Sequence, residues 1–169
     1  MTSVKFLSID PSITCTALSI LQHIDGDTFE LLHKTSLNIK SKYVDRFKKK
    51  MDMYELFKYW LDLNGENISF AVFENYSYGS SGHLADLGEL NGLYKQYLYN
   101  RSIPFETMAP ASVKKVIAGD GRASKEEVAA ALNKFLINFD TITFNNTDES
   151  DSAAIGIAYA INMLNHLKK

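Results

Sequence analysis

The feature that most constrains the fold is a nearly continuous apolar run over residues 68–73, Ile-Ser-Phe-Ala-Val-Phe, with polar residues on both sides. A strand with one face in water alternates apolar and polar residues, so a run of this kind is typical of a strand buried on both faces. Such a strand needs covering layers on both sides of its sheet. The run therefore predicts an α/β domain in which helices flank a central sheet.

The segments around this run predict a mixed sheet. Residues 4–9, roughly 14–22 and roughly 28–36 are rich in β-branched and apolar residues, and Asp25-Gly26-Asp27 is a turn signal. These segments predict three successive antiparallel strands, followed by parallel ones. Helical spacing of apolar residues places helices at about 43–63, 84–99, 110–117, 124 onward and 148–167, with a short strand at 103–107. Ser124 and Glu127 fit a capping box.

Length and composition indicate one soluble domain spanning residues 1–169. An apolar content of 46% in 169 residues is enough for a substantial core. We expect an unprocessed chain without a membrane span, because no apolar run is long enough to cross a bilayer and residues 1–5 lead directly into a strand. A single cysteine, Cys15, fits a reducing compartment, and we expect it to be a core residue of a strand.

The net charge of −2 does not indicate a nucleic-acid ligand, but its distribution is uneven. Residues 34–50 hold seven basic residues against one acid, Asp45, a local charge of +6. The basic residues are Lys34, Lys40, Lys42, Arg46, Lys48, Lys49 and Lys50. Two interpretations remain open, a stripe that contacts phosphates or the solvated face of a surface helix.

Two acids stand where predicted strands end. Asp10 follows the first strand directly before Pro11, and Glu74 ends the apolar run. Ligands of open α/β sheets gather outside strand ends, so both acids are candidates for one site. Taken singly, each is more often a solvated turn residue.

A second pair of acids opens the last predicted helix. Asp148 and Asp151 are spaced i, i+3, which places them on one helix face. Acids also favour helix N-termini because of the helix dipole. Ala153 and Ala154, however, indicate that this turn packs closely on the sheet, where two acids repel unless a cation joins them.

A site made of four carboxylates favours a hard, oxygen-seeking ion such as Mg²⁺, with Mn²⁺ able to substitute. Two such ions support hydrolysis of a phosphodiester backbone. The histidines show no ligand spacing, and we expect structural or surface roles for them: His23, His33, His83 and His166.

Several short motifs resemble those of RuvC-type Holliday-junction resolvases. Residues 8–12 (SIDPS) resemble the opening strand of that family, residues 72–75 (VFEN) its second acidic motif, and residues 148–154 (DESDSAA) its closing Asp-x-x-Asp helix. Residues 109–115 and 119–125 are similar to its basic segment, with Lys114 and Lys125 at the positions of its two functional lysines. The resemblance covers essentially the whole chain.

The resemblance implies an RNase H-like fold and a homodimer that acts in DNA recombination and repair. Each subunit would nick one of two opposed strands of a four-way junction, leaving 5′-phosphate and 3′-hydroxyl ends. The metal-binding catalytic carboxylates would be Asp10, Glu74, Asp148 and Asp151, joined by Lys125, with two ions per site. Branched DNA would be the partner, in the cytoplasm of a bacterium or of a phage-infected host. A phage-encoded member is compatible with the compact length.

The same resemblance suggests DNA contacts. Lys114, Lys115 and Arg122 would contact the backbone without reading sequence. Lys125, just inside a helix N-terminus, either helps to hold a phosphate or is a solvated surface lysine. Family members can carry a stacking aromatic three residues beyond the second acid, where this chain has Ser77. Tyr76 or Tyr78 is the candidate replacement.

The predicted helix at 84–99 is the candidate dimer contact, with ordinary packing on the sheet as the alternative. Gly88 and Gly92 would permit close approach, and Leu87, Tyr94 and Leu98 would supply apolar area. For the metal ligands, we expect the acids on strand ends, Asp10 and Glu74, to bind most directly, Asp151 firmly and Asp148 more adjustably.

Other functions remain to be separated by experiment. A related nuclease acting on flaps, other branched DNA or structured RNA would carry the same acids. An actin-like ATPase or sugar kinase would need glycine-rich phosphate loops, which the sequence lacks. A non-catalytic junction-binding module would have no reason to keep four acids.

Overall fold

The computed structural model describes residues 4–39, 45–75 and 84–167. Its core is a five-stranded sheet of order β3-β2-β1-β4-β5. The strands are β1 (Lys5–Asp10), β2 (Cys15–Asp25), β3 (Thr28–Asn38), β4 (Phe70–Glu74) and β5 (Phe105–Met108). The first three pair antiparallel, and β4 joins β1 and β5 in parallel. The predicted mixed sheet is confirmed.

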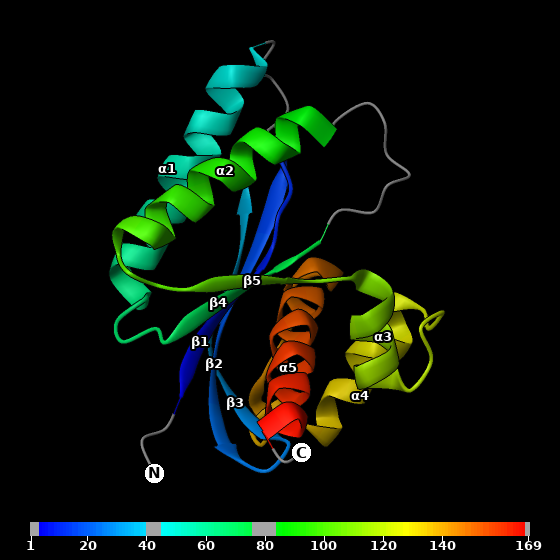
Figure 1. Ribbon diagram of the computed structural model, residues 1–169. Helices are drawn as coiled ribbons and strands as arrows, with labels where there is room; N and C mark the ends of the chain where they lie inside the picture. The colour runs from blue at the N-terminus through cyan, green and yellow to red at the C-terminus, as the bar shows by residue number, and fades with distance from the viewer. Residues whose placement is uncertain (1–3, 40–44, 76–83, 168–169) are drawn as a thin grey trace.

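Helices cover both faces of this sheet (Figure 1). On one face lie α1 (Arg46–Asn64) and α2 (Leu84–Asn100). On the other lie α3 (Pro110–Ala118), α4 (Lys125–Ala131) and α5 (Thr147–Leu167). Two short 3-10 turns, η1 (Leu132–Lys134) and η2 (Phe139–Thr141), link α4 to α5 and were not predicted.

The apolar run that predicted this layering does contact both layers. Val72 of β4 packs in the core beneath α5, whereas Ala71 and Phe73 pack in the core beneath α1 and α2. The prediction of a strand buried on both faces is therefore confirmed. β5 begins at Phe105 rather than at residue 103, because Pro104 has no amide to donate to a ladder.

Helix α5 lies very close to the sheet. A Cβ atom added at Gly156 would stand 2.7 Å from Leu21 Cδ1 and 2.9 Å from Ser8 Cβ. Near the start of the helix, the hydroxyls of Ser152 and Ser19 lie 2.6 Å apart and are fully buried. These contacts hold the first turns of α5 against β1 and β2. Among the residues with described positions, no helix is both long and apolar enough to cross a membrane.

Candidate metal centre

Three aspartates from opposite ends of the chain meet where β1, the central strand of the sheet, ends. Asp10 is the last residue of β1, and Asp148 and Asp151 lie in the first turns of α5. One carboxylate oxygen from each side chain lies within 4.8 Å of the other two. All three residues are half-buried, so their charges are screened less by water than those of exposed carboxylates.

Glu74 is adjacent to this cluster but not within it. The parallel pairing of β1 with β4 places Ile9 opposite Phe73, so the residues that follow, Asp10 and Glu74, end neighbouring strands. Glu74 lines the same cavity as Asp10 and Asp151. Among the described residues, only the three aspartates form the tight group. Glu74 therefore adds a fourth carboxylate beside the cluster, on the side that faces the cavity.

The site concentrates negative charge in a partly dry environment. Burial is the largest cause that raises the pKa of Asp10 from 3.8 to about 8. The carboxylates of Glu74, Asp151 and Asp148 raise it further, in that order. Burial likewise raises the pKa of Glu74 from 4.5 to about 6, and Asp151 adds to that shift. Lys125 opposes both shifts. Oxygen ligands under mutual repulsion fit a hard divalent cation.

Lys125 already brings a positive charge to the cluster. Its ammonium lies 2.5 Å from Asp151 Oδ2 and 3.7 Å from Asp148 Oδ1. The hydrogen bond to Asp151 is the main cause that raises the pKa of Lys125. The predicted capping box, in which Ser124 and Glu127 bond reciprocally, is present and fixes the start of α4 at this lysine. The ammonium thus stands where cationic charge is favoured.

A cavity of about 310 Å³ opens beside the cluster. Its lining contains Lys114 in addition to Lys125, and the Lys114 charge lowers the pKa of Glu74. Lys115 and Arg122 are exposed and do not line this cavity. The candidate stacking residues, Tyr76 and Tyr78, lie outside the described residues. No described histidine lines the cavity.

Cys15 is not the strand core residue that the sequence predicted. It is half-buried at the first position of β2, and its Sγ donates a hydrogen bond to Asp148 Oδ2 at 3.2 Å. Burial, followed by the contact with Asp148, raises the pKa of the thiol to about 11. The thiol is therefore a neutral donor beside the acidic cluster. A signal for this was available, since Cys15 stands at the start of a strand only five positions after Asp10.

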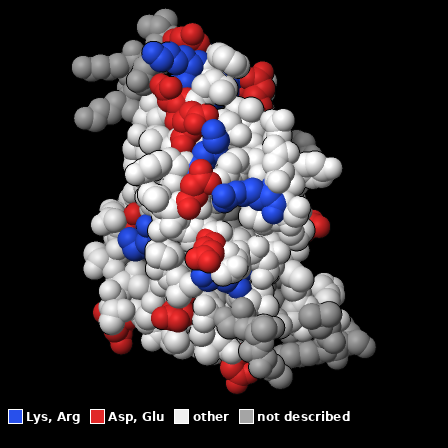
Figure 2. Space-filling view, turned by 90° about the vertical axis from the view of Figure 1, so that its left-hand side faces the viewer, with Lys and Arg blue, Asp and Glu red and all other residues white. Residues whose placement is uncertain are grey.

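The basic residues of the 34–50 segment do not form one stripe. Lys34 pairs with Glu149 on the α5 side of the sheet, whereas Lys50 is buried between α1 and α2 with Asp86 and Glu89. Arg46 also pairs with Asp86. Figure 2 shows one face of the molecule on which basic and acidic side chains are interspersed. Lys40 and Lys42 lie outside the described residues. Of the two interpretations left open by the sequence, a single stripe that contacts phosphates does not fit the described residues.

Helix α2 contributes less free apolar surface than predicted. Tyr94 and Leu98 are fully buried in the core beneath α1, and the Tyr94 ring stacks on Phe57 with centroids 4.2 Å apart. These two residues cannot supply a contact between subunits, and ordinary packing is their role. Gly92 is exposed, with nothing within 4 Å of an added Cβ atom.

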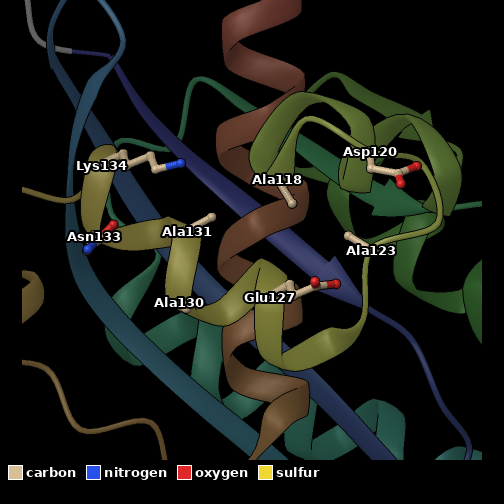
Figure 3. A pocket seen from close by; sticks show the side chains of 8 residues that line it. All are labelled: Ala118, Asp120, Ala123, Glu127, Ala130, Ala131, Asn133 and Lys134. Atoms are coloured by element: carbon tan, nitrogen blue, oxygen red, sulfur yellow. The ribbon is translucent and has the colours of Figure 1, made fainter.

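A larger cavity of about 390 Å³ lies between α3, α4 and η1 (Figure 3). Asp120 and Lys134 lie on opposite sides of it, and its wall is otherwise rich in alanine. Asp120 accepts a hydrogen bond from the amide of Arg122, and Glu127 accepts one from the amide of Ser124. These two acids therefore serve local turns and do not belong to the cluster beside Asp10.

Comparisons with known proteins identify the family of this chain. The sequence model described as "Crossover junction endodeoxyribonuclease RuvC" matches residues 6–159. A RuvC of Prochlorococcus marinus (strain MIT 9312) is 29% identical over 168 residues, covering 96% of this chain and 97% of the relative. The structure of Thermus thermophilus RuvC in complex with a Holliday junction substrate is similar with a TM-score of 0.80 and 20% identity, over 95% of this chain and 94% of that one. The yeast mitochondrial Holliday junction resolvase Ydc2 is similar with a TM-score of 0.68 and 16% identity, over 96% of this chain and 81% of that one. The chain therefore belongs to the RuvC family of crossover junction endodeoxyribonucleases.

Proposed function

We propose that this chain is a structure-selective endonuclease that resolves four-way DNA junctions by paired, symmetric nicks. The observation that carries the proposal is the cluster of Asp10, Asp148 and Asp151, whose oxygens lie within 4.8 Å of one another in a member of the RuvC family. The Thermus thermophilus relative has been solved with a Holliday junction, which supports junction DNA as the substrate.

Family membership and the acidic cluster imply use of a divalent metal. We assign Mg²⁺ as the ion, with Mn²⁺ as a substitute, and two ions per site. Asp10, Asp148 and Asp151 would hold them, and Glu74 would complete the ligand set from the strand beside Asp10. Such ions supply Lewis acidity for in-line displacement at a phosphodiester.

The lysines of the site have distinct tasks in this proposal. Lys125, which pairs with Asp151, offsets part of the carboxylate charge when no metal ion is bound. When a metal ion balances the carboxylate charge instead, Lys125 becomes available to contact the scissile phosphate. Lys114 lines the same cavity and adds a second cation for the DNA backbone. Lys115 and Arg122, which do not line this cavity, remain predicted DNA contacts, as do Tyr76 and Tyr78, which lie outside the described residues. The products would carry 5′-phosphate and 3′-hydroxyl ends.

Paired nicks require two active sites, and the described part of one chain contains one carboxylate cluster. We therefore propose a homodimer in which residues 1–169 form a single domain. The exposed stretch of α2 around Gly92 remains the candidate contact. Because curated relatives come from bacteria, we propose that the enzyme acts in the cytoplasm of a bacterium or of a phage-infected host.

The decisive experiment compares three DNA substrates with and without Mg²⁺: a synthetic four-way junction, a flap and a linear duplex. We expect metal-dependent, symmetric paired nicks in the junction and none in the duplex. Asp10→Asn should abolish cleavage while junction binding persists. Equal cleavage of junction and duplex, preferred cleavage of the flap, or an active Asp10→Asn variant would reject the assignment. Junction binding by the native chain without any cleavage would indicate a non-catalytic module.

A further inference from the structure

The first turn of α5 contains a buried acid that does not belong to the metal centre. Glu149 lies between Asp148 and Ser150 in sequence, and its side chain is only 4% exposed. Its carboxylate accepts a hydrogen bond from Lys34 Nζ at 2.5 Å. It also accepts hydrogen bonds from the backbone amide of Asn145 at 2.9 Å and from Asn145 Nδ2 at 3.0 Å. A carboxylate so enclosed is satisfied by these donors together.

The same turn is attached to the edge strand β3 at a second point. Asn146 Oδ1 accepts a hydrogen bond from the Glu149 amide at 3.0 Å, which caps the start of α5. The Asn146 side chain also contacts the hydroxyl of Ser36 on β3. The Ser36 hydroxyl lies 3.1 Å from Asn146 Oδ1, to which it can donate, and 3.0 Å from Asn146 Nδ2, from which it can accept. Lys34 and Ser36 are two residues apart on one strand and thus on one face of it. The start of α5 is therefore held to β3 by two polar contacts, one from Asn146 to Ser36 and one from Glu149 to Lys34.

These contacts bear directly on the metal centre because of where Glu149 stands. Asp148 immediately precedes it and Asp151 follows it by two positions, in the same turns of the helix. The place of these two carboxylates relative to Asp10 depends on how this end of α5 sits against the sheet. Lys34 is the only charged partner of Glu149 among the described residues. Metal ligands commonly depend on such supporting contacts for their orientation.

We propose that Lys34 and Glu149 are positioning residues of the metal centre, which hold the start of α5 so that Asp148 and Asp151 meet Asp10. The inference rests on the proposed function of this cluster as a metal site. Lys34 acts through Glu149 and touches neither metal nor DNA. Its role is thus different from the phosphate contact that the sequence suggested.

The test measures Mn²⁺ binding by calorimetry on the DNA-free protein, together with thermal unfolding. Lys34→Met leaves the Glu149 carboxylate buried without its cation. Loss of a partner that orients a metal ligand directly weakens metal binding by about 10–100-fold, and because Lys34 acts indirectly, through Glu149, we expect the lower end of that range, about 10-fold. Lys34→Arg keeps a cationic donor and should bind Mn²⁺ more tightly than Lys34→Met.

Lys50→Met is the matched control. Lys50 is likewise a lysine with carboxylate partners, Asp86 and Glu89, but it is a residue of α1 and pairs with α2, on the opposite face of the sheet from α5. Both methionine variants should lower the melting temperature. Only Lys34→Met should weaken Mn²⁺ binding. Equal Mn²⁺ affinity in Lys34→Met and the native protein, at a temperature where both are folded, overturns the proposal.

Two further variants keep the test decisive. If Lys34→Met does not fold, the neutral pair Lys34→Met with Glu149→Gln removes the buried unpaired charge, and weaker Mn²⁺ binding is still expected because the anchor to β3 is gone. Native affinity in that pair rejects the positioning role. Asp10→Asn separates the two proposals: if it binds Mn²⁺ like the native protein, the metal centre itself is misassigned.

Discussion

Asp10 is the residue on which the electrostatics of the site depend most visibly. Burial and three neighbouring acids raise its pKa to about 8, so the metal-free protein holds a proton there at neutral pH. The unfolded chain would release that proton near pH 4. The native state therefore binds more protons than the unfolded state between these values, and this residue contributes more to stability as the pH falls from 8 towards 4.

This difference predicts a pH-dependent metal affinity. A metal ligand must be deprotonated, so Mn²⁺ binding at pH 7 should release a proton from Asp10 and should strengthen as the pH rises to about 8. Calorimetry in two buffers of different ionisation enthalpy measures the released protons. Asp10→Asn should release fewer. A binding enthalpy that does not depend on the buffer would contradict the prediction.

Local patterns revealed the three clustered aspartates, because a strand end and an i, i+3 pair leave a signature in sequence. Other contacts at the site left none. Cys15 with Asp148 and Lys34 with Glu149 join positions that are 133 and 115 residues apart, and each pair exists only once the sheet has formed. In the sequence, Lys34 was therefore indistinguishable from the other basic residues of its segment, although in the structure it pairs with the buried Glu149.

At the scale of elements, periodicity predicted the type and order of every long helix and strand. It could not predict η1 and η2, because two successive 3-10 turns carry no apolar repeat. It also assigned Tyr94 and Leu98 to a possible subunit contact. An apolar helix face has the same pattern whether it meets the sheet or a partner, so only the fold could decide between them.

The close approach of α5 to the sheet predicts the effect of filling Gly156. Gly156→Ala would place a methyl group 2.7 Å from Leu21 Cδ1 and 2.9 Å from Ser8 Cβ. Overpacking of this kind destabilises by about 1–3 kcal/mol, which exceeds the gain of up to about 1 kcal/mol from replacing a helical glycine. Urea denaturation should therefore report a lower free energy of unfolding.

Gly92→Ala is the control, because it makes the same change in a helix with nothing within 4 Å of the new methyl group. Measured on dilute protein, it should raise the free energy of unfolding by up to about 1 kcal/mol. If Gly156→Ala stabilised the protein as much as Gly92→Ala does, α5 would not be held as closely to β1 and β2 as described.

At the scale of the whole molecule, the layered fold brings together one carboxylate cluster among the described residues, where β1 ends. We expect the protein in solution to have twice the 19.0 kDa mass of the chain by sedimentation equilibrium. A mixed dimer of native and Asp10→Asn subunits should nick only one strand of each junction, because each subunit carries its own metal ligands. A particle of single-chain mass that still made paired symmetric cuts would contradict the dimer.

The metal centre joins the first strand of the chain to its last helix, and this has a consequence for biosynthesis. Asp10 leaves the ribosome early, together with the strands that fold around it, whereas Asp148 and Asp151 follow only after almost every other element has been made. We expect the strands of a nascent chain to form the sheet before the metal ligands can come together. Cutting ability then requires α5, so products that stop before Asp148 are expected not to cut DNA.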